Sequence, residues 1–136
     1  MQLQQTLIKT YTFEGKGLHS GKNARMAVSP APIDTGIRFI RTDIGADAYV
    51  DALAENVSNT ARSTTISNGE VSVSTIEHLL SALTGMGVDN AIVEIDNVEV
   101  PILSEAQNLI LTRYGMTDSS SRKLPGNILN LRRPLR

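Results

Sequence analysis

The chain has 136 residues, of which 40% are hydrophobic and 20% are charged, and its formal net charge is −1. This length fits a single folded domain. The absence of Cys excludes a disulfide framework and any thiolate metal site, and no run of about 18 apolar residues predicts a membrane span. The opening segment, MQLQQTLIKTYTFEG, lacks the basic head and apolar core of a signal peptide, so we expect a cytoplasmic protein.

The pattern of apolar residues and turn signals predicts several strands and one clear helix. The strands are expected at residues 4–13, 24–29, 36–41, 64–66, 71–73, 91–95 and 98–103. Residues 15–21 are predicted to form a glycine-rich turn, and Asn68-Gly69 predicts a hairpin between the strands at 64–66 and 71–73. The helix is expected from Thr75 to Gly85 or Gly87, because glycine commonly ends a helix. The predicted fold class is α+β, a mostly antiparallel sheet with a helix packed on one face.

The start of this helix places a carboxylate, Glu77, beside an imidazole, His78. A serine followed three residues later by glutamate predicts a capping box with Ser74 as the cap. The predicted buried stripe consists of Ile76, Leu79, Leu80 and Leu83. Such a turn suits His78 as a metal ligand and Glu77 as a general base. The plainer alternative is a helix cap worth about 1 kcal/mol and a half-buried histidine. Position 82 is alanine, so the H-E-x-x-H zinc motif is absent.

Three segments carry a resemblance to a known family: GKGLHSGKNARMAVSPAP, TGIRFIRTD and TIEHLLSALTGMGVDNAIVEIDNVEVPIL. From about Gln4 to Leu103 the chain resembles UDP-3-O-acyl-N-acetylglucosamine deacetylase, the zinc amidase of lipid A synthesis. The resemblance implies the first half of a two-domain deacetylase fold, with UDP-3-O-acyl-N-acetylglucosamine as substrate and Zn²⁺ as cofactor. It identifies His78 as a zinc ligand and Glu77 as the general base. The products would be a free amine on the glucosamine ring and acetate.

Four further residues are candidates on the same resemblance. His19, in the GLHSG loop, matches a loop near the family's active site, which implies a catalytic, polar role toward the substrate or the reaction intermediate. Equally, His19 would be a loop residue that only orders its neighbours. Thr60, Arg62 and Ser63, in NTARSTT, match a segment that borders the site and imply substrate binding. The alternative for each of them is an ordinary strand with polar alternation.

A catalytic zinc needs about three protein ligands and an open position for water. The resemblance implies that two of them come from a His-x-x-x-Asp pair in a second domain, but His19 and His78 are the only histidines in this sequence. We therefore expect weak zinc binding and no useful turnover from this chain alone. The alternative from another functional class is a non-catalytic binding or structural module that keeps the fold without zinc.

The resemblance stops abruptly at Ser104, which divides the chain into an amino-terminal deacetylase domain, residues 1–103, and a divergent tail, residues 104–136. The first part contains seven Lys and Arg against twelve Asp and Glu, a net charge of −5, and the tail contains six against two, a net charge of +4. In a shifted reading frame, permitted codons for SEAQNLILTRYG can spell GSSKSYIDAIR, which supplies the Gly-Ser that the family has there. We therefore expect a frameshifted tail, with a short helix around 108–114 and disorder beyond Met116.

Two expectations about partners follow from this organisation. The outer face of the helix would lack the second helix and second domain of the family, and the exposed apolar surface predicts self-association. The basic tail, with Arg132, Arg133 and Arg136, can attract phosphates. However, no aromatic stacking residues are interleaved and the body is acidic, so we expect no nucleic-acid partner.

Overall fold

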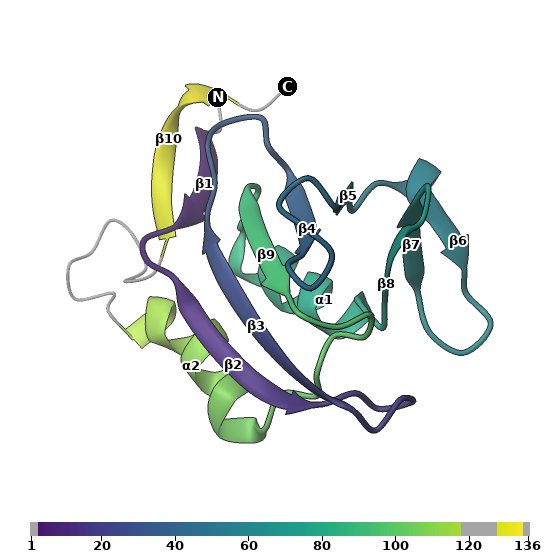
Figure 1. The fold of residues 1–136 in the computed structure, drawn as a ribbon. Helices are drawn as coiled ribbons and strands as arrows, with labels where there is room; N and C mark the ends of the chain where they lie inside the picture. The colour runs from purple at the N-terminus through teal and green to yellow at the C-terminus, as the bar shows by residue number, and fades with distance from the viewer. Residues whose placement is uncertain (1–2, 118–127, 135–136) are drawn as a thin grey trace.

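The computed structural model describes residues 3–117 and 128–134, and these form strands, two α-helices and one short 3-10 helix, η1 (Figure 1). The elements are β1 (Leu3–Leu7), β2 (Tyr11–Lys16), β3 (Asn23–Pro30), β4 (Ile37–Arg41), β5 (Tyr49–Asp51), η1 (Ala54–Asn56), β6 (Val57–Asn59), β7 (Thr65–Asn68), β8 (Val71–Ser74), α1 (Glu77–Met86), β9 (Ala91–Ile95), α2 (Glu105–Thr117) and β10 (Ile128–Pro134). Neither α-helix is long and apolar enough, over the residues that are described, to cross a membrane.

The strands form three sheets, which are mostly antiparallel. The largest has the order β2-β3-β9-β4-β5, and within it β4 and β9 run parallel. A second sheet has the order β6-β7-β8, and β1 pairs with β10 in a two-stranded sheet. The predicted α+β class with a helix packed on a mostly antiparallel sheet is therefore confirmed.

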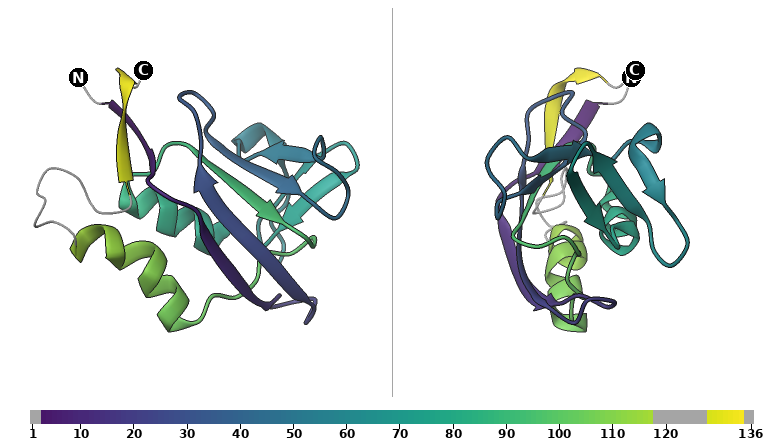
Figure 2. Two further views of the ribbon diagram at one scale, coloured as in Figure 1. Left: turned by 60° about the vertical axis from the view of Figure 1, so that its left-hand side comes forward. Right: turned by 45° about the vertical axis from the view of Figure 1, so that its right-hand side comes forward.

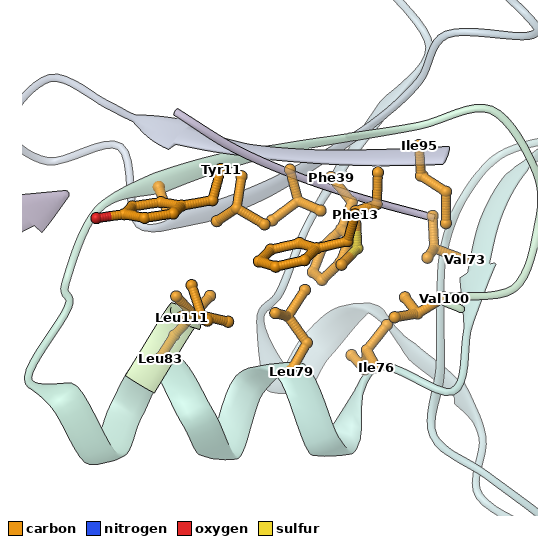
Figure 3. Close-up of a cluster of buried hydrophobic side chains, with 14 of the residues drawn as sticks. Tyr11, Phe13, Phe39, Val73, Ile76, Leu79, Leu83, Ile95, Val100 and Leu111 are labelled. Carbon is orange, nitrogen blue, oxygen red and sulfur yellow. The ribbon is translucent and has the colours of Figure 1, made fainter. Parts of the chain in front are cut away.

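The hydrophobic core lies between one face of the largest sheet and the two helices (Figures 2 and 3). Side chains alternate along a strand, so β2 buries Tyr11 and Phe13 on the same face. The predicted stripe of α1 is confirmed, because Ile76, Leu79 and Leu83 are buried and Leu80 packs partly against them. The helix ends at Gly87, one of the two predicted end points, in the left-handed conformation that glycine adopts easily.

A buried polar cluster fastens β1 to the end of the largest sheet. The Asn90 side chain donates to Gln4 Oε1 at 2.9 Å and accepts from the backbone N–H of Gly36 at 2.9 Å. Thr6 Oγ1 donates to the Asn90 carbonyl at 2.6 Å and accepts from the Ala31 N–H at 2.9 Å. Each of these buried polar groups thus has a partner, as burial requires.

Two of the predicted strands differ in the structure. The prediction of one strand over 4–13 is wrong, because exposed residues at 8–10 interrupt it and β1 leaves the largest sheet to pair with β10. The strand predicted at 98–103 is also wrong, since this segment makes only isolated bridges, from Glu99 to Ser74 and from Pro101 to Gly17. Pro101 has no N–H to offer a ladder. The hairpin at Asn68-Gly69 is confirmed by the pairing of β7 with β8.

The tail contributes to the folded structure. The short helix predicted around 108–114 is confirmed as part of the longer α2, and Leu111 of α2 is fully buried in the core. The expectation of disorder does not hold at 128–134, which form β10. The serine run and Pro125-Gly126 lie outside the described residues. Self-association remains a prediction, although α2 does place a second helix beside α1.

Candidate active site

The chain enters α1 through a sharp bend at Thr75. Thr75 has φ of 61°, in the left-handed region that β-branched residues seldom adopt. Ile76 is the N-cap residue, and no side chain caps the helix. The predicted capping box is therefore wrong: Ser74 is the last residue of β8, and its N–H donates to the Val98 carbonyl at 2.8 Å. The bend places residues 77 and 78 in the first turn of the helix.

Glu77 is anchored to the segment that leads into β7. Its Oε1 accepts a hydrogen bond from the Thr64 N–H at 3.0 Å, and the Thr64 carbonyl accepts from the Thr75 N–H at 2.9 Å. Thr64 thus holds both the carboxylate and the bend. Among the described residues, no donor contacts the other oxygen, Oε2. One oxygen of Glu77 therefore orients the group, and the other is available to a proton.

His78 is exposed at the same helix start rather than packed in the core. It lines a cleft of about 540 Å³ between α1 and the segment over residues 100–103. Most of the other lining residues are apolar: Leu18, Leu79, Ala82, Val100, Pro101, Ile102 and Leu103, with Thr75, Ser81 and Asn108 as the polar ones. An imidazole at the wall of an apolar cleft suits a metal ligand or a group that contacts an apolar substrate.

A second pocket, of about 440 Å³, brings together three other predicted site residues. His19, Arg62 and Ser63 all line it, and the chain segments that supply them are far apart in the sequence. Thr60 is exposed but is not among the lining residues. His19 and His78 therefore line different pockets, and the loop over residues 17–20 borders both, because Leu18 lines the cleft of His78.

The sequence did not point to Glu99, whose buried carboxylate lies at the boundary of the two pockets. Its side chain is only 3% exposed, and it accepts hydrogen bonds from Thr75 Oγ1 at 2.7 Å, from the Ser20 N–H at 2.8 Å and from the His19 N–H at 3.1 Å. Burial raises the pKa of Glu99, but these hydrogen bonds outweigh burial and lower the pKa below its ordinary value. Glu99 is therefore ionised at neutral pH.

One signal in the sequence could have drawn attention to Glu99. It stands between Val98 and Val100 and two residues before Pro101, in a segment otherwise fit for burial. A charged residue is almost never fully buried unless it is paired. In the predicted strand over residues 98–103, the Glu99 side chain would lie on the face opposite Val98 and Val100 and would point toward solvent. The local sequence pattern therefore did not predict its burial.

The residues present do not complete a catalytic zinc site by themselves. Over the residues that the structure describes, no group of three or more histidine, aspartate or glutamate side chains is arranged to hold a metal ion, and the chain has no Cys. Zinc in a catalytic site takes about three protein ligands. His78 can supply one nitrogen ligand. The other ligands of a catalytic zinc would have to come from residues other than those that the structure describes.

The sequence matches the family model for UDP-3-O-acyl N-acetylglycosamine deacetylase over residues 4–134. The chain is 50% identical over 100 residues to UDP-3-O-acyl-N-acetylglucosamine deacetylase of Pseudomonas entomophila, an alignment that covers 74% of this chain and 33% of the relative. It is 52% identical over 103 residues to the enzyme of the same name from Citrifermentans bemidjiense, with 76% and 34% covered.

A relative with a composite name shows a similar match. The bifunctional enzyme LpxC/FabZ of Porphyromonas gingivalis is 47% identical over 103 residues, which cover 76% of this chain and 22% of the relative. The alignments thus span about a third or less of the length of these curated relatives.

Proposed function

Because the chain belongs to the UDP-3-O-acyl N-acetylglycosamine deacetylase family, we propose that it forms the amino-terminal part of the active site of a zinc-dependent amidase. The reaction removes the N-acetyl group of UDP-3-O-acyl-N-acetylglucosamine in lipid A synthesis. The observation that carries this proposal is the pair at the start of α1, an exposed His78 at a cleft and an anchored Glu77 beside it. Zinc, when bound, supplies a water of lowered pKa and polarises the amide carbonyl.

Glu77 is the general base in this proposal, and His78 is the contribution of this chain to the metal. A general base must lie within hydrogen-bond reach of the proton that it takes. The bond from Thr64 leaves Oε2 of Glu77 to take a proton from water and to pass it to the leaving nitrogen. Because α1 carries both residues in one turn, the base and the ligand keep a fixed relation to each other.

The second pocket binds a polar part of the same substrate in this proposal. Arg62 offers a guanidinium, which suits phosphate oxygens, and Ser63 adds a hydroxyl. His19 acts from the opposite loop toward the substrate or the reaction intermediate. Thr60 adjoins this group from the exposed stretch before Arg62 and assists binding.

A second candidate function is a non-catalytic binding or structural module that has the fold without the metal. The observation that favours it is the incomplete ligand set among the described residues. The two candidates give different answers when the missing ligands are supplied from outside the chain.

Zinc content and deacetylation of the purified 136-residue chain are the first measurement. We expect less than one tightly bound zinc ion per chain and no turnover, because a single imidazole ligand is too few to hold zinc tightly. The chain is then mixed with the unaligned carboxyl-terminal part of the Pseudomonas entomophila relative, and the relative divided at the same place is the positive control. The amidase proposal requires restored deacetylation that His78→Ala abolishes and Thr84→Ala, an exposed control on α1, preserves. Restoration by the divided relative alone would favour the non-catalytic module.

We also propose that residues 104–136 are encoded out of frame. The relatives align over 100 or 103 residues, and the charge composition changes at Ser104. Sequencing of the coding DNA is expected to place a small insertion or deletion near codon 103 or 104. An intact frame, with the same tail in close relatives, would contradict this and would agree with the family model's match through residue 134.

A further inference from the structure

We propose that Glu99 is a positioning residue of this site, which holds the bend at Thr75 and the loop over residues 17–20 in one arrangement. Through Thr75 it sets how Glu77 and His78 enter α1, and through the loop it sets the place of His19. The inference rests on the proposed function and names a further residue for the same site.

The contacts of the Glu99 carboxylate support this role. Oε2 accepts from Thr75 Oγ1 at 2.7 Å, and Oε1 accepts from the Ser20 N–H at 2.8 Å. The His19 N–H lies 3.1 Å from both oxygens. All of these donors belong to segments that border the pockets of His19 and His78. The carboxylate therefore connects the two halves of the candidate site, the bend at Thr75 and the loop over residues 17–20, and takes no part in strand pairing.

The Thr75 hydroxyl connects Glu99 to the start of α1. A β-branched residue at φ of 61° stores strain, and such a conformation persists only where the surroundings impose it. Two bonds impose it here: Thr75 Oγ1 donates to Glu99, and the Thr75 N–H donates to Thr64. Because the next two residues after the N-cap are Glu77 and His78, relaxation of this bend would change where both side chains lie.

The loop side of the arrangement is packed just as closely. A Cβ on Gly17 would overlap the Glu99 carboxylate and would lie 2.6 Å from Ser20 Oγ. The Gly17 carbonyl accepts from the Gly21 N–H at 3.0 Å, which closes the loop. The absence of a side chain at position 17 thus lets the loop approach the carboxylate closely enough to donate two backbone N–H groups.

The test compares Glu99→Gln with Asp89→Asn in the metal-free 136-residue chain. Asp89 is a matched control, because its carboxylate accepts the Gln5 N–H at 2.8 Å away from the site. Glu99→Gln keeps the shape but replaces an acceptor oxygen by an NH₂ group. By amide hydrogen exchange in NMR, we expect the amides of His19, Ser20 and Thr75 to exchange about tenfold faster or more. The amides of β9 should stay within about twofold, and the His78 ring signals should shift.

A second pair of variants acts on the partner of Glu99. Thr75→Val removes the hydroxyl and keeps the branched shape, whereas Thr75→Ser keeps the hydroxyl. Thr75→Val should reproduce the faster exchange and the shifted His78 signals, and Thr75→Ser should resemble the parent chain. This pair decides the matter even where Glu99→Gln fails to fold.

Three results would overturn the inference. Equal loss of protection in β9 would mean a general structural role for Glu99. Changes at His19 and Ser20 alone, with Thr75 and His78 as in the parent, would mean that the two halves are not connected. Equal hydrogen exchange and equal His78 signals in the two Thr75 variants would mean that the Thr75 hydroxyl does not hold the bend. Since no zinc or substrate is present, failure of the deacetylation test leaves these outcomes unaffected.

Discussion

The packing of α2 on the core can be tested by truncation of Leu111. This side chain has 0% exposure, and Figure 3 shows it in the same buried cluster as Leu83 of α1, beneath the sheet. Leu111→Ala removes three carbon atoms, each worth about 0.8 kcal/mol of transfer free energy. The cavity that remains adds to this cost, so we expect the free energy of unfolding to fall by about 3–4 kcal/mol. That is a large share of the stability of a domain of this size.

Urea denaturation followed by far-ultraviolet circular dichroism measures this loss, and Leu109→Ala is the matched control. Leu109 lies in the same helix but is 46% exposed, so the same change of side chain should cost less than about 1 kcal/mol. If both variants lower the free energy of unfolding equally, α2 does not pack on the core. The tail would then be an appendage to a domain that is stable without it.

Three further predictions concern buried polar groups. The pKa of Glu99 is lower in the folded state than in the unfolded state. Its contribution to stability is therefore complete above the unfolded-state pKa of about 4.3 and is lost as pH falls through the folded-state pKa. The urea midpoint of the parent chain should fall more steeply toward acid pH than that of Glu99→Gln. Gly17→Ala should lower the free energy of unfolding by about 1–3 kcal/mol through overlap with Glu99, and an unchanged urea midpoint would contradict this. Asn90→Ala should cost about 2–3 kcal/mol, because the Gly36 N–H loses its acceptor and Gln4 Oε1 loses one of its two donors and keeps only the Asp34 N–H. A loss below about 0.5 kcal/mol would mean that water replaces the amide.

Local chemistry alone predicted those elements whose ends are set by nearby residues. Asn68-Gly69 fixed the hairpin because Gly69 can adopt the φ of 65° that the turn needs. Gly87 ended α1 for the same reason. The apolar spacing of Leu79 and Leu83 predicted the buried face of α1, since a helix repeats every 3.6 residues. Glu77 and His78 lie in the first turn of α1, where the sequence placed them, but the hydrogen bond from Thr64 to Glu77 was not predicted.

Elements that depend on distant partners could not be predicted in this way. Ser74 and Glu77 have the spacing of a capping box, but Ser74 is committed to β8 and to the Val98 carbonyl. β10 pairs with β1 across more than a hundred residues of sequence, and no local sequence pattern in either strand predicts that pairing. Glu99 was missed for a related reason. Its burial depends on donors 24 to 80 residues away in the sequence.

The arrangement around Glu99 has a consequence for how the two pockets respond to change. His78 and His19 line separate pockets, so truncation of either imidazole removes a group from one pocket and leaves the wall between them in place. Thr75 lines the first pocket and Glu99 lines the second, and the 2.7 Å hydrogen bond between them is part of that wall. A perturbation at this bond therefore alters both pockets together, whereas distant and independent sites respond additively. Such coupling would be expected of a site whose base, metal ligand and substrate contacts must keep one geometry.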